Sequence, residues 1–214
     1  MSNSGAGLIL GSIEKDLVLA SETGSLRRLL EACGLTFRLM PLSLDEVATH
    51  QALLKNMGET DPADVAEMLT RAKIDEASAR FPGALIIGAH QVISLNGKLL
   101  EKPTTVEAAR DRLFELRDKT HELHSAVALA EEEGQITWTH VETAQLTMRS
   151  FSAQFVGRYL AAAGPKVCES PGAYELDGIG LQLFDRIQGD YLALLGVPFL
   201  LLFARLRESG FMAT

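Results

Sequence analysis

The sequence predicts an α/β protein in which a mixed, twisted central sheet is flanked by helices. Apolar runs typical of buried strands, such as 17–20 and 84–89, alternate with segments of helical spacing. Two long segments of strand composition, 122–130 and 136–148, enclose an acidic turn and predict an antiparallel hairpin. With 214 residues, of which 47% are hydrophobic and 22% charged, the chain can bury one substantial core.

The N-terminal part is expected to form a strand, a loop and a helix. The strand at 17–20 runs into a hydroxyl-rich loop, and a helix follows over 25–34, where a glycine supplies its stop. A second short strand is expected at 37–41. An Asp-Pro pair then begins a helix at 61–80, because aspartate caps helix N-termini and proline suits the first helical position.

The middle of the chain combines buried strands with a tight turn and a helix. We expect a strand at 84–89 and another at 92–95, which turns at Asn96-Gly97, a pair typical of hairpins. Thr104 or Thr105 then caps a helix, since a threonine hydroxyl can accept a hydrogen bond from the first turn.

The C-terminal third follows the long hairpin. It is predicted to contain a helix over 152–163, a Gly/Pro-rich loop, a strand over 181–187 and a final helix over 198–209. No linker stands out, although a lobe boundary near residue 80 or 150 is compatible with the pattern. We therefore expect one domain over 17–214, preceded by an N-terminal extension at 1–16.

Composition and charge exclude several classes of partner. A net charge of -8 argues against a general nucleic-acid or membrane surface, because both need cationic side chains to neutralise phosphates. Cys33 and Cys168 form no CxxC pair, so neither a zinc site nor a disulfide framework is indicated. The most apolar run, 192–204, is well short of the ~20 residues that span a bilayer. With no recognisable signal peptide, the expected location is cytoplasmic.

One set of polar residues predicts a site for a polyphosphate. Hydroxyls follow the first strand, arginines lie on the first turn of the next helix, and two lysines are available further along. Backbone N–H groups at a helix N-terminus, hydroxyls and cations are what phosphate groups need. The predicted phosphate ligands are Ser21, Thr23, Arg27, Arg28, Lys73 and Lys102.

A carboxylate is also expected, because metal-assisted phosphate chemistry uses hard oxygen ligands and a base that orients water. Glu46, beside Asp45 in a polar loop, is the best candidate. A second acid is missing from the place where the mechanism would want one. The strand-end pair His90-Gln91 lies there instead.

These residues belong to a series of landmarks that closely resembles the Maf family of nucleoside triphosphate pyrophosphatases, over about residues 17–208. In order, the landmarks are Leu19-Ala-Ser-x-Thr23, Asp45-Glu46, Lys73, Gly88-Ala-x-Gln-Val92, Lys102-Pro103, Lys119-Thr-His121, Gly172-Ala-Tyr174, Gly178-x-Gly180, and Gly189-Asp-Tyr191 through Gly196-x-Pro198. The resemblance implies two lobes around a nucleotide cleft, as in inosine triphosphatase-like folds. It also implies a Mg²⁺- or Mn²⁺-dependent hydrolysis of a nucleotide to its monophosphate and pyrophosphate, and a homodimer.

The sequence departs from the family pattern at His90, where the resemblance implies an aspartate that acts as base or metal ligand. Imidazole is a poor Mg²⁺ ligand and better suits Mn²⁺ or Co²⁺, but it can deprotonate water near neutral pH. Three interpretations stay open: His90 is a working substitute base, its presence cripples catalysis, or it is a structural histidine and the chemistry lies elsewhere.

A second departure concerns the arginines. Without a gap, Leu26 falls where the family has its first arginine and Arg27 falls at the second; a shift of one residue gives Arg27 and Arg28 instead. Loss of one charge-assisted contact would remove roughly 1.5–3 kcal/mol of binding.

The resemblance also bears on the base. Family members that act on dTTP and UTP are expected to carry glutamine where this chain has Asp177, and Gln91 resembles the subgroup that acts on methylated guanine nucleotides. A carboxylate only accepts hydrogen bonds, so it favours the donor edge of guanine over uracil. The other interpretation of Asp177 is a turn cap.

Together these observations predict a pyrophosphatase with a 7-methyl-GTP-like preference. In it, Glu46 and His90 hold a divalent metal (Mg²⁺, Mn²⁺ or Co²⁺), Lys73 and Lys102 assist catalysis, and Gln91 and Asp177 contact the base. The alternative is a nucleotide-binding homologue that has lost turnover. A third hypothesis, a regulator of cell division, follows only from the family's association with septum formation.

Overall fold

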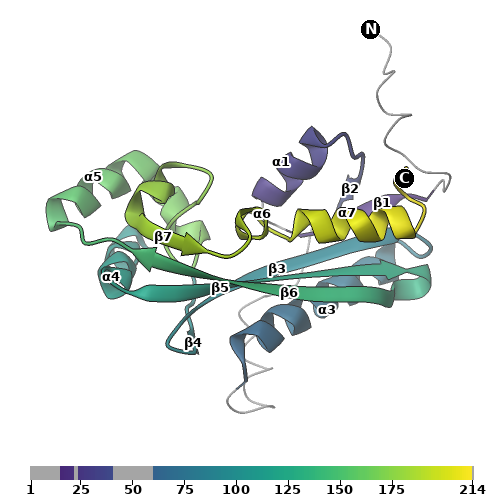
Figure 1. The fold of residues 1–214 in the computed structure, drawn as a ribbon, viewed down its shortest axis with the longest axis horizontal. Helices are drawn as coiled ribbons and strands as arrows, with labels where there is room; N and C mark the ends of the chain where they lie inside the picture. Colours follow the sequence, from purple (N-terminus) through teal and green to yellow (C-terminus); the bar gives the residue numbers. More distant parts are fainter. Residues whose placement is uncertain (1–14, 22–23, 41–59, 214) are drawn as a thin grey trace, which may run out of the picture.

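A seven-stranded mixed sheet forms the centre of the computed structural model, which describes residues 15–21, 24–40 and 60–213 (Figure 1). The strands are β1 (Leu17–Ala20), β2 (Arg38–Leu39), β3 (Leu85–Leu95), β4 (Lys98–Leu99), β5 (Thr120–Glu131), β6 (Gln135–Met148) and β7 (Phe184–Gln188). Their order is β2-β1-β3-β5-β6-β7, and β4 pairs with β3. The pairs β1–β2 and β1–β3 are parallel and the others are antiparallel, which confirms the predicted mixed sheet.

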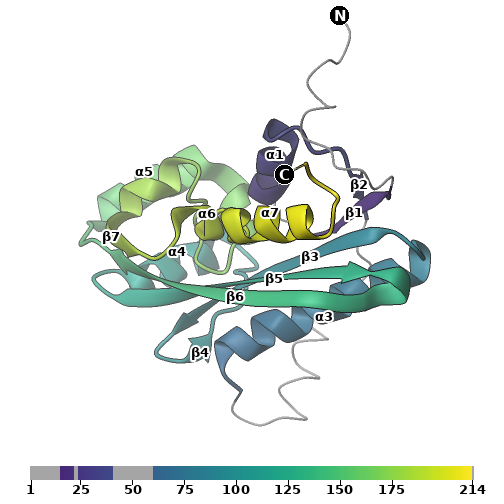
Figure 2. The ribbon, with the colours of Figure 1, turned by 45° about the vertical axis from the view of Figure 1, so that its right-hand side comes forward.

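Helices lie on both faces of this sheet (Figure 2). The α-helices are α1 (Gly24–Ala32), α3 (Pro62–Arg80), α4 (Val106–Leu116), α5 (Ala153–Ala163), α6 (Tyr191–Leu194) and α7 (Phe199–Glu208), and the 3₁₀ helices are η2 (Glu132–Gly134), η3 (Gly164–Glu169) and η4 (Ile179–Leu183). Helix α3 runs below the sheet in the view of Figure 1, whereas α1, α6 and α7 lie above it. None of the described helices is long and apolar enough to cross a bilayer.

Strand β1 is buried on both faces, because successive side chains of a strand point to opposite sides of the sheet. Leu17 and Leu19 pack with α1 and α7, whereas Val18 and Ala20 pack with α3. This double burial explains why the sequence shows a continuous apolar run here rather than an alternation.

The core on the α1 and α7 side is divided into two clusters at opposite ends of the long strands. One cluster joins α1 and α7 to Leu85 and Ile87 in the first half of β3. The other joins α4 and α5 to Ile93 and Leu95 in the second half of the same strand. Strands β3 and β5 contribute to both clusters, so the two expected lobes share one continuous sheet.

A difference in strand length leaves part of β3 open. The short strand β1 pairs with β3 only as far as Gly88, and β4 pairs with it only from Ser94. Strand β5 covers the opposite edge of β3 from Ile86 to Ser94. Residues 89–93 therefore have one edge that none of the described strands covers, and polar side chains of β3 can reach a ligand there.

Local signals in the sequence give most helix starts correctly. Asp61, Thr105 and Ser152 each accept a hydrogen bond from a backbone N–H of the following turn, at 2.9, 3.1 and 3.2 Å. Asn96 and Gly97 have the positive φ angles, 53° and 76°, of the predicted hairpin turn. Thr105, rather than Thr104, is thus the cap of α4.

Three strand predictions need correction. The segments 84–89 and 92–95 form the single strand β3, because β5 pairs with it almost throughout and holds it extended. Of the strand expected at 37–41, only Arg38–Leu39 is a strand, and Pro41 lies outside the described residues. The strand expected at 181–187 begins as η4 and is extended only from Phe184.

Candidate functional site

A cleft with a volume of about 730 Å³ lies along the open edge of β3, between α1 and the irregular segment that follows α5. Two walls face each other across it. The sheet wall consists of residues at the ends and edges of regular elements, and its polar members are Ser25, Arg28, Lys73, His90, Gln91 and Lys102. The loop wall comes from residues 166–177, and its members are Lys166, Cys168, Glu169, Ser170, Pro171, Tyr174, Glu175, Leu176 and Asp177.

His90 and Gln91 are adjacent on β3 and so point to opposite faces of the sheet. The Nε2 of Gln91 donates to the Oγ of Ser125 at 2.7 Å and to the carbonyl oxygen of Ala193 at 3.0 Å. Gln91 thus anchors α6 above the sheet, while His90 lies on the side of α3. The amide nitrogen of Gln91 thus already has partners within the protein. The role of Gln91 in base binding stays a prediction.

Lys73 is the most buried cation of the cleft, with 2% of its surface exposed. It lies on α3, which packs tightly against β3. A Cβ added to Gly88 would come within 2.6 Å of the Ile74 side chain and 3.1 Å of the Thr70 carbonyl oxygen, so only glycine permits this approach. Because interactions between charges strengthen away from water, a buried ammonium at this position attracts an anion more strongly than a surface lysine does.

Of the two arginines of helix α1, Arg27 and Arg28, only one lines the cleft. Ser25 and Arg28 are three residues apart, so they share a face of the helix, and both line the cleft. Arg27 points elsewhere: its Nε donates to the carboxylate of Glu31 at 2.9 Å, and 52% of its side chain is exposed. Arg28 is therefore the arginine of α1 that lies in the cleft, and Arg27 is not among the lining residues.

Asp177 connects the two walls. Its carboxylate accepts hydrogen bonds from the Ser25 hydroxyl, at 2.8 Å, and from the Arg28 guanidinium, with which it forms an ion pair. Partial burial by itself would raise the pKa of the Asp177 carboxyl. The hydrogen bonds from Ser25 and Arg28, together with the charge of Arg28, outweigh that effect and hold the pKa below its usual value.

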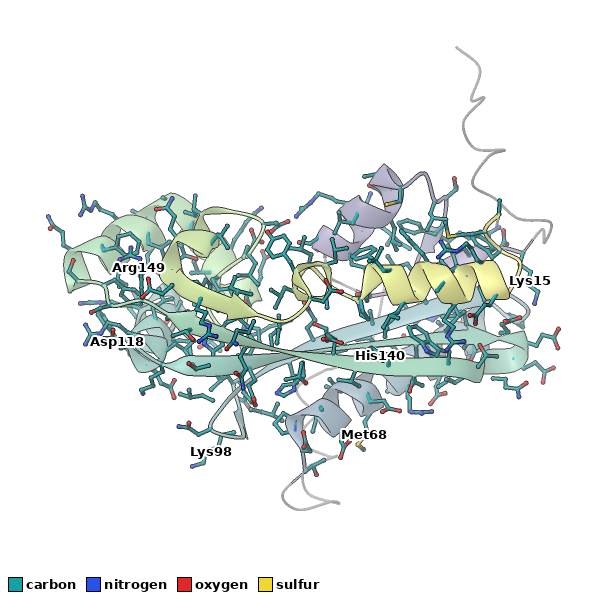
Figure 3. The ribbon with its side chains drawn as sticks, in the orientation of Figure 1. Lys15, Met68, Lys98, Asp118, His140 and Arg149 are labelled. Atoms are coloured by element: carbon teal, nitrogen blue, oxygen red, sulfur yellow. The ribbon has the colours of Figure 1, made fainter. Side chains whose placement is uncertain are left out.

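Lys102 lies at the far end of the sheet wall, just after β4. Arg112 of α4 fixes this region, because its Nη1 donates to the carbonyl oxygens of Glu101, at 3.0 Å, and Pro171, at 2.5 Å. One partly buried guanidinium thus ties the segment before Lys102 to the loop wall. By contrast, Lys98 and Arg149 lie outside the cleft, at the β3–β4 hairpin and beside α5 (Figure 3).

The remaining predicted ligands are placed as follows. Ser21 is buried directly after β1, with 7% of its surface exposed, and is not among the lining residues. Thr23 and Glu46 lie outside the described residues. Within the described ranges, no three His, Cys, Asp or Glu side chains gather in a way that could hold a metal ion. The metal site predicted from Glu46 and His90 therefore stays a prediction.

Sequence reasoning missed the charged residues of the loop wall other than Asp177. Lys166, Glu169 and Glu175 come from η3 and an irregular turn, where no periodicity indicates which side chains face inward. The nearby Gly172-Ala-Tyr174 and Gly178-x-Gly180 patterns were the available signal, since closely spaced glycines indicate a tight path of the backbone. A second cavity of about 220 Å³ lies behind this segment and shares Lys166, Tyr174 and Glu175 with the cleft.

The fold and the cleft define an α/β protein with several cations at the interrupted edge of its sheet. Residues 16–209 match the model of the Maf-like protein family, and the chain belongs to that family. It is 44% identical over 194 residues to a 7-methyl-GTP pyrophosphatase of Rhizobium johnstonii, covering 91% of this chain and 96% of the relative. A nucleoside triphosphate pyrophosphatase of Paramagnetospirillum magneticum is 43% identical over 194 residues, covering 90% of this chain and 98% of the relative.

Proposed function

We propose that the protein is a nucleoside triphosphate pyrophosphatase that acts on a guanine nucleotide of the 7-methyl-GTP type. The observation that carries the proposal is the meeting of Arg28, Lys73 and Lys102, from three separate elements, in one cleft of a Maf-like chain. The two relatives described above are named as pyrophosphatases of 7-methyl-GTP and of nucleoside triphosphates, which supports this activity. The reaction adds water across the anhydride between the α and β phosphates and yields a nucleoside monophosphate and pyrophosphate.

The sheet wall supplies the contacts for the triphosphate. Arg28 comes from α1, Lys102 from the segment after β4 and the buried Lys73 from α3, and all three line the cleft at the open edge of β3. Together they neutralise charge on the phosphate chain, and this stabilisation grows as negative charge develops on the departing pyrophosphate. The low exposure of Lys73 supports assigning it the strongest attraction for a phosphate group.

His90 is assigned the proton transfer. It lies on the same face of β3 as the residues that pack against α3, and it lines the cleft. A neutral imidazole nitrogen there accepts a proton from the attacking water. Deprotonated water then forms the new bond to phosphorus while the pyrophosphate oxygen leaves.

A divalent ion is expected to accompany the nucleotide. Glu46 is the proposed protein ligand. His90 is a second ligand only in place of its role as base, since a neutral imidazole has one free nitrogen lone pair, and as a ligand it fits Mn²⁺ or Co²⁺ better than Mg²⁺. Mg²⁺ bound with nucleotides takes most of its ligands from phosphate oxygens and water, so few protein ligands are required in either case. When bound, the ion would neutralise phosphate charge and lower the pKa of a coordinated water.

The loop wall is assigned the base. Its carboxylates can only accept hydrogen bonds, and the N1–H and N2–H₂ edge of guanine donates them. A 7-methylguanine base also carries a positive charge, which Glu169, Glu175 and Asp177 would attract. A cytoplasmic homodimer that binds neither nucleic acid nor membrane stays a prediction, consistent with the net charge of -8.

The test is pyrophosphate release by the purified protein from 7-methyl-GTP, GTP, UTP and dTTP, each with Mg²⁺, Mn²⁺ and Co²⁺. We expect turnover of 7-methyl-GTP to exceed that of UTP and dTTP. Titration calorimetry with the same nucleotides separates binding from turnover. The proposal is wrong if none of the nucleotides binds at millimolar concentration, or if UTP and dTTP bind more tightly than the guanine nucleotides.

A further inference from the structure

Residues 172–174 form a turn in the loop wall, directly before Glu175. Three contacts from the core hold this turn in place. The Nε2 of His121, on β5, lies 2.8 Å from the Oη of Tyr174. The Oη of Tyr159, on α5, donates to the carbonyl oxygen of Ala173 at 3.1 Å. The Tyr174 ring packs edge-on against Phe184 of β7, with ring centroids 4.9 Å apart. Helix α5 and two strands of the central sheet, β5 and β7, therefore converge on one turn.

The backbone of this turn adopts an uncommon conformation. Ala173 has a φ of 60°, a left-handed conformation that residues with a side chain seldom adopt. A Cβ added to Gly172 would come within 2.2 Å of the Tyr174 ring, so the ring lies directly on the backbone of the turn. Such a conformation persists only when its surroundings hold it. The tyrosine ring and its partners are the surroundings that do so.

His121 contributes one polar contact to this arrangement. Its side chain is 1% exposed, and the hydroxyl of Tyr174 is its hydrogen-bond partner. Its other ring nitrogen, Nδ1, is buried and has no hydrogen-bond partner among the described residues. Burial lowers the pKa of His121 to about 4, so the ring is neutral at pH 7. A phenylalanine would bury the same area without an unsatisfied nitrogen, so packing alone does not account for a histidine here.

Residues 174–177 alternate in exposure. Tyr174 and Leu176 are buried, with 4% and 6% of their surfaces exposed, whereas Glu175 and Asp177 are exposed, and all four border the cleft. Tyr174 and Leu176 both pack in the core cluster of α4 and α5, and one carboxylate follows each of them directly in the chain. Fixing the Tyr174 ring therefore fixes the positions of both carboxylates.

We propose that His121 and Tyr174 form a positioning pair that sets the geometry of the base-selecting carboxylates Glu175 and Asp177. The pair acts through the backbone of 174–177 and touches no reacting atom. The inference rests on the proposed function, because it assigns the loop wall to recognition of the base. It predicts that loss of the bond between the two side chains impairs selection among nucleotides more than it impairs the chemical step.

The experiment compares Tyr174→Phe, His121→Leu, the double variant and His121→Gln with the natural protein. Glutamine can place a polar atom near the position of the histidine Nε2, so it serves as the rescue variant. His124→Leu is the matched control: His124 is a buried histidine of the same strand that bonds Ser94, at 3.0 Å, and does not line the cleft. KM and kcat are measured for 7-methyl-GTP and UTP, and dissociation constants are measured by calorimetry.

We expect Tyr174→Phe and His121→Leu each to raise KM for 7-methyl-GTP about tenfold and to change kcat less than about threefold, because ground-state positioning is what they remove. The double variant should match the single ones, since residues that act as a unit are not additive. His121→Gln should restore KM to within about threefold of the natural value. His124→Leu should lower thermal stability and leave the ratio of the two KM values unchanged.

Unchanged KM ratios in both single variants, or additive effects in the double variant, overturn the inference. Tyr174→Phe removes only one oxygen atom, so it decides the matter if His121→Leu does not fold. The proposed function fails separately, when the natural protein releases no pyrophosphate. In that case the calorimetric preference for 7-methyl-GTP over UTP is the readout, and an unchanged preference in Tyr174→Phe still contradicts the positioning pair.

Discussion

The two walls of the cleft differ in construction and in charge. The sheet wall is built from α1, α3, β3 and the segment after β4, and its charged members are the cations Arg28, Lys73 and Lys102. The loop wall is a 3₁₀ turn and an irregular segment, and three of its four charged members are acidic. A site for a nucleotide needs both kinds of surface, since the phosphates are anionic and the base edge is polar. In the proposed function, regular elements would hold the cations that bind the phosphates, and a loop fixed by side-chain contacts would hold the carboxylates that select the base.

The two walls also contact each other directly. Asp177 of the loop wall binds Arg28 and Ser25 of the sheet wall. A triphosphate must therefore compete with a carboxylate for the same guanidinium, or bind beside the pair. Variants that act on one wall alone are the means to separate these effects.

The largest effect is expected at His90, on the sheet wall. His90→Ala removes the proposed base and should lower kcat about a thousandfold, in the range of general base catalysis. The measurement is steady-state pyrophosphate release with Mn²⁺. His90→Asp provides the complementary test: an increase of about a hundredfold or more, with Mg²⁺, would show that the natural protein binds nucleotides but is impaired in turnover, and unchanged activity would show that the position is misassigned.

The folding stability of the protein at acidic pH tests whether the buried His121 supports the loop wall. Burial lowers the pKa of His121 to about 4 from the ordinary 6.5, so the unfolded chain binds a proton before the folded one does. This difference has no effect above pH 6.5, and it destabilises the fold progressively as the pH falls from about 6.5 to about 4, by about 3 kcal/mol in total. Urea unfolding of the natural protein and His121→Leu across this range should show that this part of the loss is absent from the variant.

The other buried histidine of β5, His124, does not affect the difference between the natural protein and the variant. His124 is also buried, and desolvation lowers its pKa against the opposing effect of Glu122 and Asp61, but it is present in both proteins and cancels in the difference. Equal pH dependence of the natural protein and His121→Leu would mean that His121 is solvated in solution.

Lys73 tests the claim that the sheet wall bears the phosphate charge. Lys73→Met keeps the length of the buried side chain and removes its cation, and we expect kcat/KM to fall about a hundredfold, as when one contact to developing charge is lost. Lys98→Met is the control, because Lys98 is an exposed lysine of the β3–β4 hairpin outside the cleft (Figure 3). Similar losses in both variants would indicate a general effect of net charge.

The smallest effect is expected at Asp177, where the two walls meet. Asp177→Asn keeps the shape of the side chain and should reduce the preference for 7-methyl-GTP over UTP about tenfold, by loss of a charge-assisted contact to the base. Asp185→Asn, an exposed substitution on β7, is the control. A uniform gain in affinity for every nucleotide would instead show that Asp177 acts only by restraining Arg28.

Much of the sheet wall could be predicted from the sequence because local signals determine it. The apolar run of β1, the Asp-Pro start of α3 and the glycine at position 88 each describe a backbone conformation or a packing requirement. His90 and Lys73, which the motif series indicated, both line the cleft. The break expected between 84–89 and 92–95 was wrong, since polar residues in the middle of a strand do not interrupt it when a partner such as β5 pairs along its length.

Other features had no local signal. The choice between Arg27 and Arg28 depends on the rotation of α1, which the packing of Leu26 and Leu30 decides. Gln91 has a polar partner on α6, about a hundred residues away in sequence, and the loop wall depends on contacts from α4, α5, β5 and β7.

The sequence alone therefore determined the fold class and the family, and it indicated Arg28, Lys73 and Lys102 of the cleft, because periodicity, caps and motif spacing are readable along the chain. Only the tertiary structure decided which arginine enters the cleft, that Asp177 bonds to the same arginine, and that a buried histidine and tyrosine hold the opposite wall. Those outcomes depend on side chains brought together from distant parts of the chain, and burial and hydrogen bonding act on them only after the chain has folded.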